Sequence, residues 1–299
     1  MSARQLAEVV RRVTAVFSGW TPESTLDQIR GEWDALFSDY EPVVDATAVA
    51  VDAGGVRAEW IAAPDARPDR TIFFLHGGGY VLGSVDSHRD ICERLSHLAR
   101  ARVLAVDYRL APEHPFPAPL DDALTAYRWM LDQDVDPAGL ALAGDSAGAG
   151  LGLALMTVLR DRALPLPACA ALMSPWVDME VSGETMASND AIDPMVRKPM
   201  VETMVQLFMG DAGDRRDPRA NLLCADLHGL PPMIVHSGTH ETLLDDARRV
   251  VARLREAGVP VDYRIWDGQI HVFHIFAARL DEGAQAIEEL AHFIRGHIG

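Results

Sequence analysis

Short apolar runs alternate with longer amphipathic stretches from about residue 70 onward, and this alternation limits the folds that the chain can adopt. Six of the runs are typical of strands: "TIFFLH", "RVLAVDY", "LALAG", "CAALMSP", "PMIVHSG" and "VDYRIWDG". Helical patterns lie between or after them near 119–133, 147–162, 244–257 and 282–297. Strands and helices that alternate in this way form crossover units. The sequence therefore predicts an α/β fold whose mostly parallel sheet is covered on both faces.

The segment before this pattern has a different character. Residues 1–45 predict two amphipathic helices separated by a polar, proline-marked break at 21–24. Four apolar residues of the second helix share one face: Leu26, Ile29, Trp33 and Phe37. The runs "ATAVAVDA" and "VRAEWIAA" then flank Gly54-Gly55, which predicts a β-hairpin.

A second exception, residues 179–220, has no obvious strand and holds six of the eleven methionines: Met179, Met186, Met195, Met200, Met204 and Met209. Methionine packs adaptably and suits a pocket for varied apolar groups, although ordinary core filling accounts for the pattern equally well. We expect an N-terminal cap segment at 1–45, a cap insertion at 179–220, and one main domain at 46–178 and 221–299.

Composition excludes several classes of function. The formal charge is −17, from 44 acidic and 27 basic residues, and so acidic a surface repels nucleic acid and anionic lipid. The three cysteines lie far apart in the chain, which favours reduced thiols over a disulfide framework: Cys92, Cys169 and Cys224. The N-terminal stretch lacks the unbroken apolar core of a signal peptide, and no run is long enough to span a bilayer. We expect a cytoplasmic protein without nucleic-acid partners or stable membrane association.

The stretch "GDSAG" at 144–148 lies between an apolar strand pattern and an apolar helix pattern. A strand–G-x-S-x-G–helix sequence makes a sharp turn that exposes the serine hydroxyl above the carboxyl end of a sheet. The five residues alone are a weak signal, since small residues cluster in many turns. Their placement between strand and helix favours Ser146 as a nucleophile.

A nucleophilic serine requires donors for the oxyanion that it creates, and "HGGG" at 76–79 follows a strand pattern directly. Glycines let backbone N–H groups converge on one point, and each donor is worth roughly 10²–10³ in rate. A flexible turn is the alternative. A phosphate loop is disfavoured because neither G-x-G-x-x-G nor G-x-x-x-x-G-K-[ST] is present.

Together, "HGGG", "DYRLAPE" at 107–113 and "GDSAG" resemble the hormone-sensitive-lipase-like family of bacterial α/β-hydrolase esterases. The likeness continues through "SPW" at 174–176 and covers roughly residues 45–299. It implies an α/β-hydrolase sheet of about eight strands flanked by helices, a small helical cap, and ester hydrolysis without a cofactor or metal. It also implies that Tyr80 lies near the pocket rim and that the 107–113 run packs close to the "HGGG" loop. We expect a structural supporting role for Asp145, Tyr80, Arg109 and Glu113.

The chain order Ser, acid, His in this fold selects the other catalytic residues. His271 follows the last predicted strand and matches the family's Gly-x-x-His step at 268–271, whereas His274 falls within a helical segment. Glu241 lies just past the strand "PMIVHSG", where the family usually has Asp-x-Leu. The alternatives Asp245 and Asp246 lie at a helix start, where capping is the ordinary role.

These residues predict a serine carboxylesterase for short- to medium-chain esters with the triad Ser146, Glu241 and His271. The oxyanion is expected at the backbone N–H groups of Gly77, Gly78 and Ala147. Four residues are predicted to form the substrate pocket: Tyr80, Trp176, Met204 and Phe208.

Other readings of the sequence are weaker. A lactone hydrolase would use the same apparatus. A ligand-binding protein on a hydrolase scaffold typically lacks the catalytic histidine, which is present here. The pair His236 and His240 lacks the H-E-x-x-H pattern of a zinc site. The family also suggests a homodimer through the last strand, "VDYRIWD".

Overall fold

The structure, a computed structural model, describes residues 2–21, 23–42 and 44–299. Its centre is one eight-stranded sheet in the order β1-β2-β4-β3-β5-β6-β7-β8. The first two strands pair antiparallel, as do β2 and β4, and the remaining neighbours are parallel. The strands are β1 (Thr47–Asp52), β2 (Arg57–Ala62), β3 (Arg67–Leu75), β4 (Ala101–Val106), β5 (Leu140–Asp145), β6 (Cys169–Met173), β7 (Met233–Gly238) and β8 (Val261–Trp266). The predicted α/β-hydrolase sheet and its hairpin at Gly54-Gly55 are confirmed.

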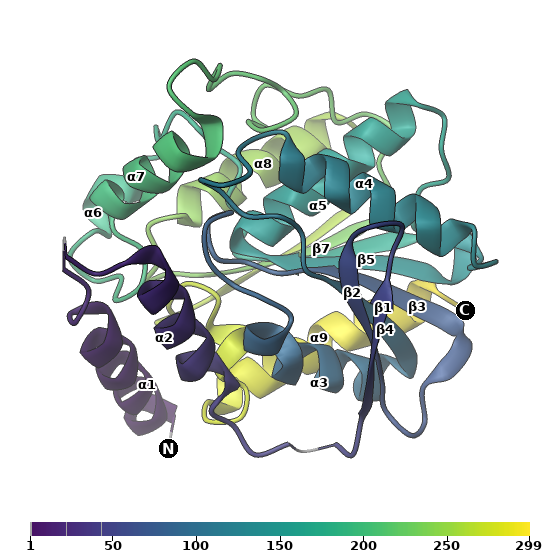
Figure 1. Ribbon diagram of the computed structural model, residues 1–299, viewed down its shortest axis with the longest axis horizontal. Helices are drawn as coiled ribbons and strands as arrows, with labels where there is room; N and C mark the ends of the chain where they lie inside the picture. The colour runs from purple at the N-terminus through teal and green to yellow at the C-terminus, as the bar shows by residue number, and fades with distance from the viewer. Residues whose placement is uncertain (1, 22, 43) are drawn as a thin grey trace.

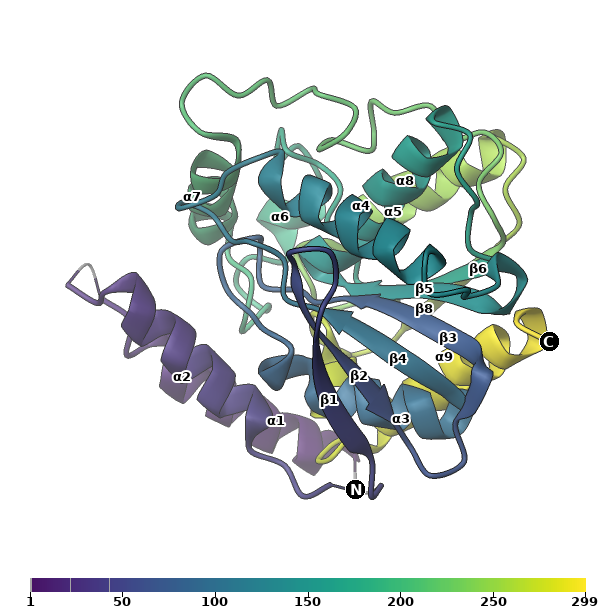
Figure 2. The ribbon, with the colours of Figure 1, turned by 45° about the vertical axis from the view of Figure 1, so that its right-hand side comes forward.

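Helices cover both faces of this sheet. In Figure 1 and Figure 2, α3 (Arg89–Ala99) and α9 (Asp281–His297) lie on one face, and α4 (Ala118–Leu131), α5 (Ser146–Asp161) and α8 (Leu244–Glu256) lie on the other. The expected helices near 119–133, 147–162, 244–257 and 282–297 are confirmed. Helix α3 was not predicted, although Ile91, Leu95 and Leu98 recur there at helical spacing. Short 3₁₀ helices occur at η1 (Asp86–His88), η2 (Pro137–Gly139) and η3 (Phe273–Phe276).

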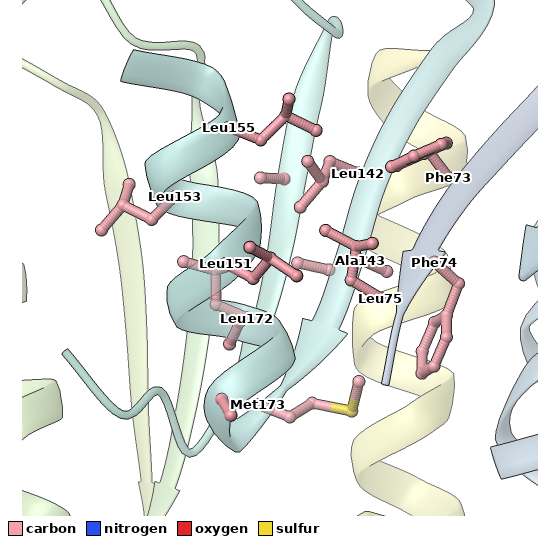
Figure 3. Packing of buried hydrophobic residues seen from close by; sticks show 14 of the residues in the cluster. Phe73, Phe74, Leu75, Leu142, Ala143, Leu151, Leu153, Leu155, Leu172 and Met173 are labelled. Carbon is pink, nitrogen blue, oxygen red and sulfur yellow. The ribbon is translucent and has the colours of Figure 1, made fainter. Parts of the chain in front are cut away.

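The hydrophobic core fills both sides of the sheet, and one part of it lies between the sheet and α5. Aliphatic and aromatic side chains from β3, β5 and β6 interdigitate with the leucines of α5 in Figure 3, among them Phe73, Leu142 and Leu155. Both faces of these central strands are buried, which accounts for their continuous apolar runs. This rigid layer fixes the carboxyl ends of β3, β5 and β6, where the candidate site lies.

The two N-terminal helices, α1 (Ser2–Phe17) and α2 (Leu26–Ser38), pack side by side at one end of the molecule (Figure 2). A capping box begins α2: the Gln28 N–H donates to Thr25 Oγ1, and the Thr25 N–H donates to Gln28 Oε1. The predicted break between the two helices holds at Thr21, Glu23 and Ser24, and its Pro22 lies outside the described residues. Of the apolar face expected on α2, Trp33 and Phe37 are buried.

Residues 179–220 form a loop-rich excursion with α6 (Thr185–Ser188) and α7 (Lys198–Met209). Its two ends meet: the Leu222 N–H donates to the Val177 carbonyl at 3.0 Å, beside a 3.4 Å hydrogen bond from Asn221 Nδ2 to Asp178 Oδ1. No strand occurs among its residues, all of which the structure describes. Because the excursion leaves and rejoins the main domain at one point, its folding does not interrupt the sheet.

Candidate active site

The turn from β5 into α5 holds Ser146 in the left-handed region, with φ +51°. The positions two residues before and two residues after it have room for glycine only. A Cβ on Gly148 would lie 2.1 Å from the Leu75 carbonyl oxygen, and one on Gly144 would lie 2.8 Å from the same atom. The strained turn therefore requires glycine on both sides and presents the Ser146 hydroxyl at the edge of the sheet.

His271 reaches this hydroxyl from the loop between β8 and η3. Its Nε2 lies 2.9 Å from Ser146 Oγ, close enough to accept the hydroxyl proton. His274 does not reach the serine. It lies within η3, as the sequence predicted for a helical residue, and its Nε2 is 3.2 Å from Nδ1 of the buried His236.

Glu241 lies in the turn after β7 and completes the chain of hydrogen bonds. Its Oε2 is 2.6 Å from His271 Nδ1, and its Oε1 accepts the Gly238 N–H at 2.6 Å. The carboxylate is fully buried, so both of its oxygens depend on these partners. The structure thus brings Ser146, His271 and Glu241 into one line.

This pairing sets the proton affinity of the histidine. Burial lowers the pKa of His271, but the hydrogen bond and charge of Glu241 outweigh burial, and the pKa lies above the ordinary value of 6.5. Burial also raises the pKa of Glu241, and the neighbouring His271 opposes that rise. The arrangement stabilises the imidazolium that forms when His271 takes a proton.

The other two acidic candidates face away from His271. Asp245 Oδ2 accepts the Thr185 N–H at 3.0 Å, and Asp246 Oδ2 accepts the N–H groups of Val177 and Asp178, both at 3.0 Å. Neither residue is the N-cap of α8, which is Leu243, and the Leu243 side chain makes no capping hydrogen bond. The expected N-cap role is therefore wrong, although both carboxylates lie in the first turn of α8, where the helix dipole favours them, and both bind the 177–185 segment to α8.

The loop at 76–79 lies beside the serine, but its first glycine is already engaged. The Gly77 N–H donates to Asp145 Oδ1 at 2.9 Å and lies 3.3 Å from His88 Nε2. This corrects the prediction that Gly77 helps to bind the oxyanion, because its only N–H points to Asp145. Within the described part of the chain, the N–H groups of Gly78 and Gly79 have no protein acceptor. The Ala147 N–H lies in the first turn of α5 and therefore has no acceptor within the helix.

An apolar cavity opens onto Ser146 and His271. Most of its walls come from α2, the 195–204 segment and the chain at 272–275, and Trp176 and Leu243 add to them. The apolar lining residues are Trp33, Phe37, Trp176, Met195, Val196, Met200, Val201, Met204, Leu243, Val272 and Ile275. The predicted pocket residues Trp176 and Met204 are among them. Trp33 and Phe37 were not predicted as pocket residues, although a cap segment was expected at 1–45 and their shared apolar face was a signal for this role.

Tyr80 and Phe208 do not line the cavity, which corrects their predicted place. Their rings stack at 3.8 Å between centroids with an interplanar angle of 6°, and both are nearly fully buried. The ring of Trp176 lies 5.7 Å from that of Tyr80 and covers it. The stacked pair therefore supports the wall of the cavity from behind.

The residues expected to give structural support have partners of that kind. Asp145 holds the Gly77 N–H, Arg109 binds Asp122 with its shortest contact at 2.7 Å, and Glu113 binds Arg30 of α2 at 2.8 Å. Asp145 thus ties the loop at 76–79 to the end of β5, and the other two residues tie the 107–113 segment to α4 and to α2.

Comparison with known proteins agrees with this geometry. A family model for the alpha/beta hydrolase fold matches residues 72–275. A solved esterase from the bacterial hormone-sensitive lipase family superposes with a TM-score of 0.95 at 43% identity, covering 99% of both chains. The chain belongs to this family. An acetyl-hydrolase of Streptomyces hygroscopicus is 41% identical to the present chain over 249 residues, which are 83% of each of the two chains. An esterase of Acinetobacter venetianus is 35% identical over 239 residues, 80% of this chain and 78% of its own.

This hormone-sensitive-lipase-like protein is therefore a carboxylic ester hydrolase that acts on small-molecule substrates. No helix among its described residues is both long and apolar enough to cross a membrane. The same residues contain no group of three or more histidine, cysteine, aspartate or glutamate side chains arranged to hold a metal ion.

Proposed function

We propose that the protein hydrolyses short- to medium-chain carboxylic esters through an acyl-enzyme on Ser146. The observation that carries the proposal is the unbroken chain of hydrogen bonds from Ser146 through His271 to Glu241, at 2.9 and 2.6 Å, at the floor of an apolar cavity. The names of similar proteins, an acetyl-hydrolase and an esterase, agree with it.

In the first step, His271 Nε2 takes the proton from Ser146 Oγ as that oxygen attacks the ester carbonyl carbon. Glu241 holds the Nδ1–H tautomer of His271 and stabilises the imidazolium that results. The imidazolium then gives its proton to the departing alkoxide oxygen. An alcohol leaves, and the acyl group stays on Ser146.

The negative oxygen of the tetrahedral intermediate is proposed to bind at the N–H groups of Gly78, Gly79 and Ala147. These groups border the cavity or the nucleophile turn, and the start of α5 adds its favourable dipole. Gly79 replaces Gly77 in this role because of the Gly77–Asp145 hydrogen bond.

Water completes the cycle. With His271 again neutral, its Nε2 removes a proton from a water molecule, whose oxygen attacks the acyl carbonyl carbon. The second tetrahedral intermediate collapses as His271 returns the proton to Ser146 Oγ, and a carboxylic acid is released.

The cavity walls support a cap and a limited chain length. We propose that residues 1–45 and 179–220 form a cap over the main domain at 46–178 and 221–299, because α2 and α7 both contribute side chains to the cavity above Ser146. Apolar side chains close around the serine, which suits a small acyl group. We also propose that the protein is cytoplasmic, because its three cysteines are free thiols. We propose a homodimer through β8, because this strand is at the edge of the sheet and its Ile265 is 43% exposed.

The test is hydrolysis of p-nitrophenyl esters from acetate to palmitate by the wild type and by Ser146→Ala. We expect turnover of the short and medium chains and a loss on the order of 10⁶-fold in the variant. No turnover of any ester by the folded wild type would refute the proposal, and a parallel series of lactones would then show whether ring esters are the substrates.

A further inference from the structure

A second buried carboxylate lies close to the triad and comes from the cap insertion. Asp193 is fully buried and accepts three backbone hydrogen bonds. Its Oδ2 accepts the Thr242 N–H at 2.8 Å, and its Oδ1 accepts the N–H groups of Met195 and Val196, both at 2.9 Å. One side chain therefore touches two functional parts: the residue after Glu241, and the 195–196 wall of the substrate cavity.

Other groups of the insertion hold the same turn. Asn189 Nδ2 donates to the carbonyl oxygens of Thr239 and Glu241, at 3.0 and 2.9 Å. The Thr242 hydroxyl lies 3.2 Å from the Val196 carbonyl oxygen, to which it donates. The backbone on both sides of Glu241 is thus fixed by residues about 50 positions earlier in the chain.

Charge links Asp193 to the histidine as well. Burial raises the pKa of Asp193, while the positive form of His271 and the three N–H donors favour its carboxylate. The carboxylate in turn helps to raise the pKa of His271, after Glu241 and ahead of Asp145. His274, from η3, faces His271 as well, and burial together with the charges of His236 and His271 lowers its pKa, so it stays neutral.

We propose that Asp193 is a positioning residue that joins the cap insertion to the catalytic acid. It holds the Glu241 turn in register with His271 and at the same time anchors the cavity wall at Met195 and Val196. The inference rests on the proposed function, since the turn matters to the rate only if Glu241 orients His271.

The variant Asp193→Asn separates this role from simple anchoring of the cap. An amide has one acceptor oxygen in place of two, so it cannot serve both Thr242 and the 195–196 wall. We expect kcat to fall roughly 10- to 100-fold, because small displacements of catalytic groups have effects of that size. We also expect KM to rise a few-fold, because Met195 and Val196 line the cavity.

The pH profile gives a second readout. Removing the negative charge lowers the pKa of His271, so the acidic limb of kcat/KM should move to lower pH in Asp193→Asn. Asn189→Ala removes two hydrogen bonds to the turn and no charge. It should lower kcat about tenfold and leave KM and the acidic limb in place.

Asp190→Asn is the matched control. Asp190 lies in the same segment, at a surface position, where it accepts the Lys198 N–H at 2.8 Å and makes no contact with the turn. It should behave as the wild type. Wild-type kcat and an unmoved limb in Asp193→Asn would overturn the inference. Equal losses in all three variants, with equal falls in melting temperature, would also overturn it.

Two further outcomes are possible: Asp193→Asn does not fold, or the wild type is inactive. If Asp193→Asn does not fold, Asn189→Ala decides: a lower kcat at unchanged KM supports the inference, and an unchanged kcat refutes it. If the wild type hydrolyses no ester, the proposed function itself fails. An active wild type with an unaffected Asp193→Asn refutes the positioning role alone.

Discussion

The turn that carries Ser146 and the turn that carries Glu241 lie at the same edge of the sheet, but different forces hold them. The serine turn is fixed by close backbone packing: a Cβ on Gly148 would lie 2.1 Å from the Leu75 carbonyl oxygen. The glutamate turn is also closely packed, since a Cβ on Gly238 would lie 2.1 Å from the Gln269 carbonyl oxygen, but it is held in addition by polar side chains of the cap insertion, Asp193 and Asn189. The first depends on residues adjacent in the fold's core, and the second on a distant part of the chain.

This difference has a practical consequence. The backbone around Gly148 leaves no space for a side chain, so a single added methyl group should disrupt the serine turn. The glutamate turn depends in addition on the charge and hydrogen-bond donors that the cap insertion supplies. The two turns should therefore fail in different ways when they are altered.

The largest effect is expected at the glutamate turn itself. Glu241→Gln keeps the size of the side chain but replaces the acceptor of the His271 Nδ1–H with an amide, which favours the wrong tautomer. We expect kcat for p-nitrophenyl butyrate to fall about 10³- to 10⁴-fold. Asp245→Asn, whose carboxylate binds Thr185, is the control and should keep most of the activity. Full activity in Glu241→Gln would remove Glu241 from the mechanism.

The serine turn is tested by Gly148→Ala. Its new Cβ would overlap two backbone oxygens, those of Leu75 at 2.1 Å and His76 at 2.4 Å, so the turn must move. We expect kcat to fall on the order of 10²-fold or more, with a lower melting temperature. Gly31→Ala is the matched control, since nothing lies within 4 Å of its added Cβ, and alanine favours the α2 helix. Normal activity in Gly148→Ala would show that the turn is not sterically fixed.

The pH dependence compares the two turns in one protein. His271 must be neutral to take the serine proton, and its pKa is raised above 6.5. Activity should therefore be full at higher pH and should fall as the pH drops through that raised pKa, about tenfold per unit below it. In a plot of log kcat/KM against pH, the acidic limb should begin above pH 6.5 in the wild type and at a lower pH in Glu241→Gln. If the acidic limb begins at the same pH in the variant, Glu241 does not raise the pKa of His271.

The smallest effect is expected where α2 joins the serine side of the site. Arg30 binds Glu113 at 2.8 Å and donates to the carbonyl oxygens of Val81 and Ala111. Because Glu113 is half-exposed, Arg30→Ala should lower the free energy of unfolding by only about 1 kcal/mol. KM should rise a few-fold, because α2 carries Trp33 and Phe37 into the cavity.

Arg11→Ala serves as the control for this variant, since Arg11 is an exposed residue of α1 that pairs with Glu8. An unchanged KM in Arg30→Ala would mean that α2 keeps its place without this contact.

The contrast between the turns also explains what the sequence could predict. Alternating strands and helices and the glycines around Ser146 are local patterns, and they were sufficient for the fold and for the candidate nucleophile. The assignment of Glu241 and His271 also needed the order of the triad in this fold and the resemblance to the family. The hydrogen bond from Gly77 to Asp145 joins residues 68 positions apart, so nothing local to "HGGG" indicated which glycine N–H was already used. Asp193 was missed for the same reason, because its partner Thr242 lies 49 positions away. Stacking of Tyr80 on Phe208, which removes both from the cavity, likewise depends on the folded cap.

The most direct measurement is the site of covalent modification by a serine-reactive phosphonate, read by mass spectrometry of the intact protein and of its peptides. The account predicts one adduct per chain, located on Ser146, and no adduct in Ser146→Ala. Modification at another residue, or none in the folded wild type, would contradict the claim that Ser146 is the nucleophile.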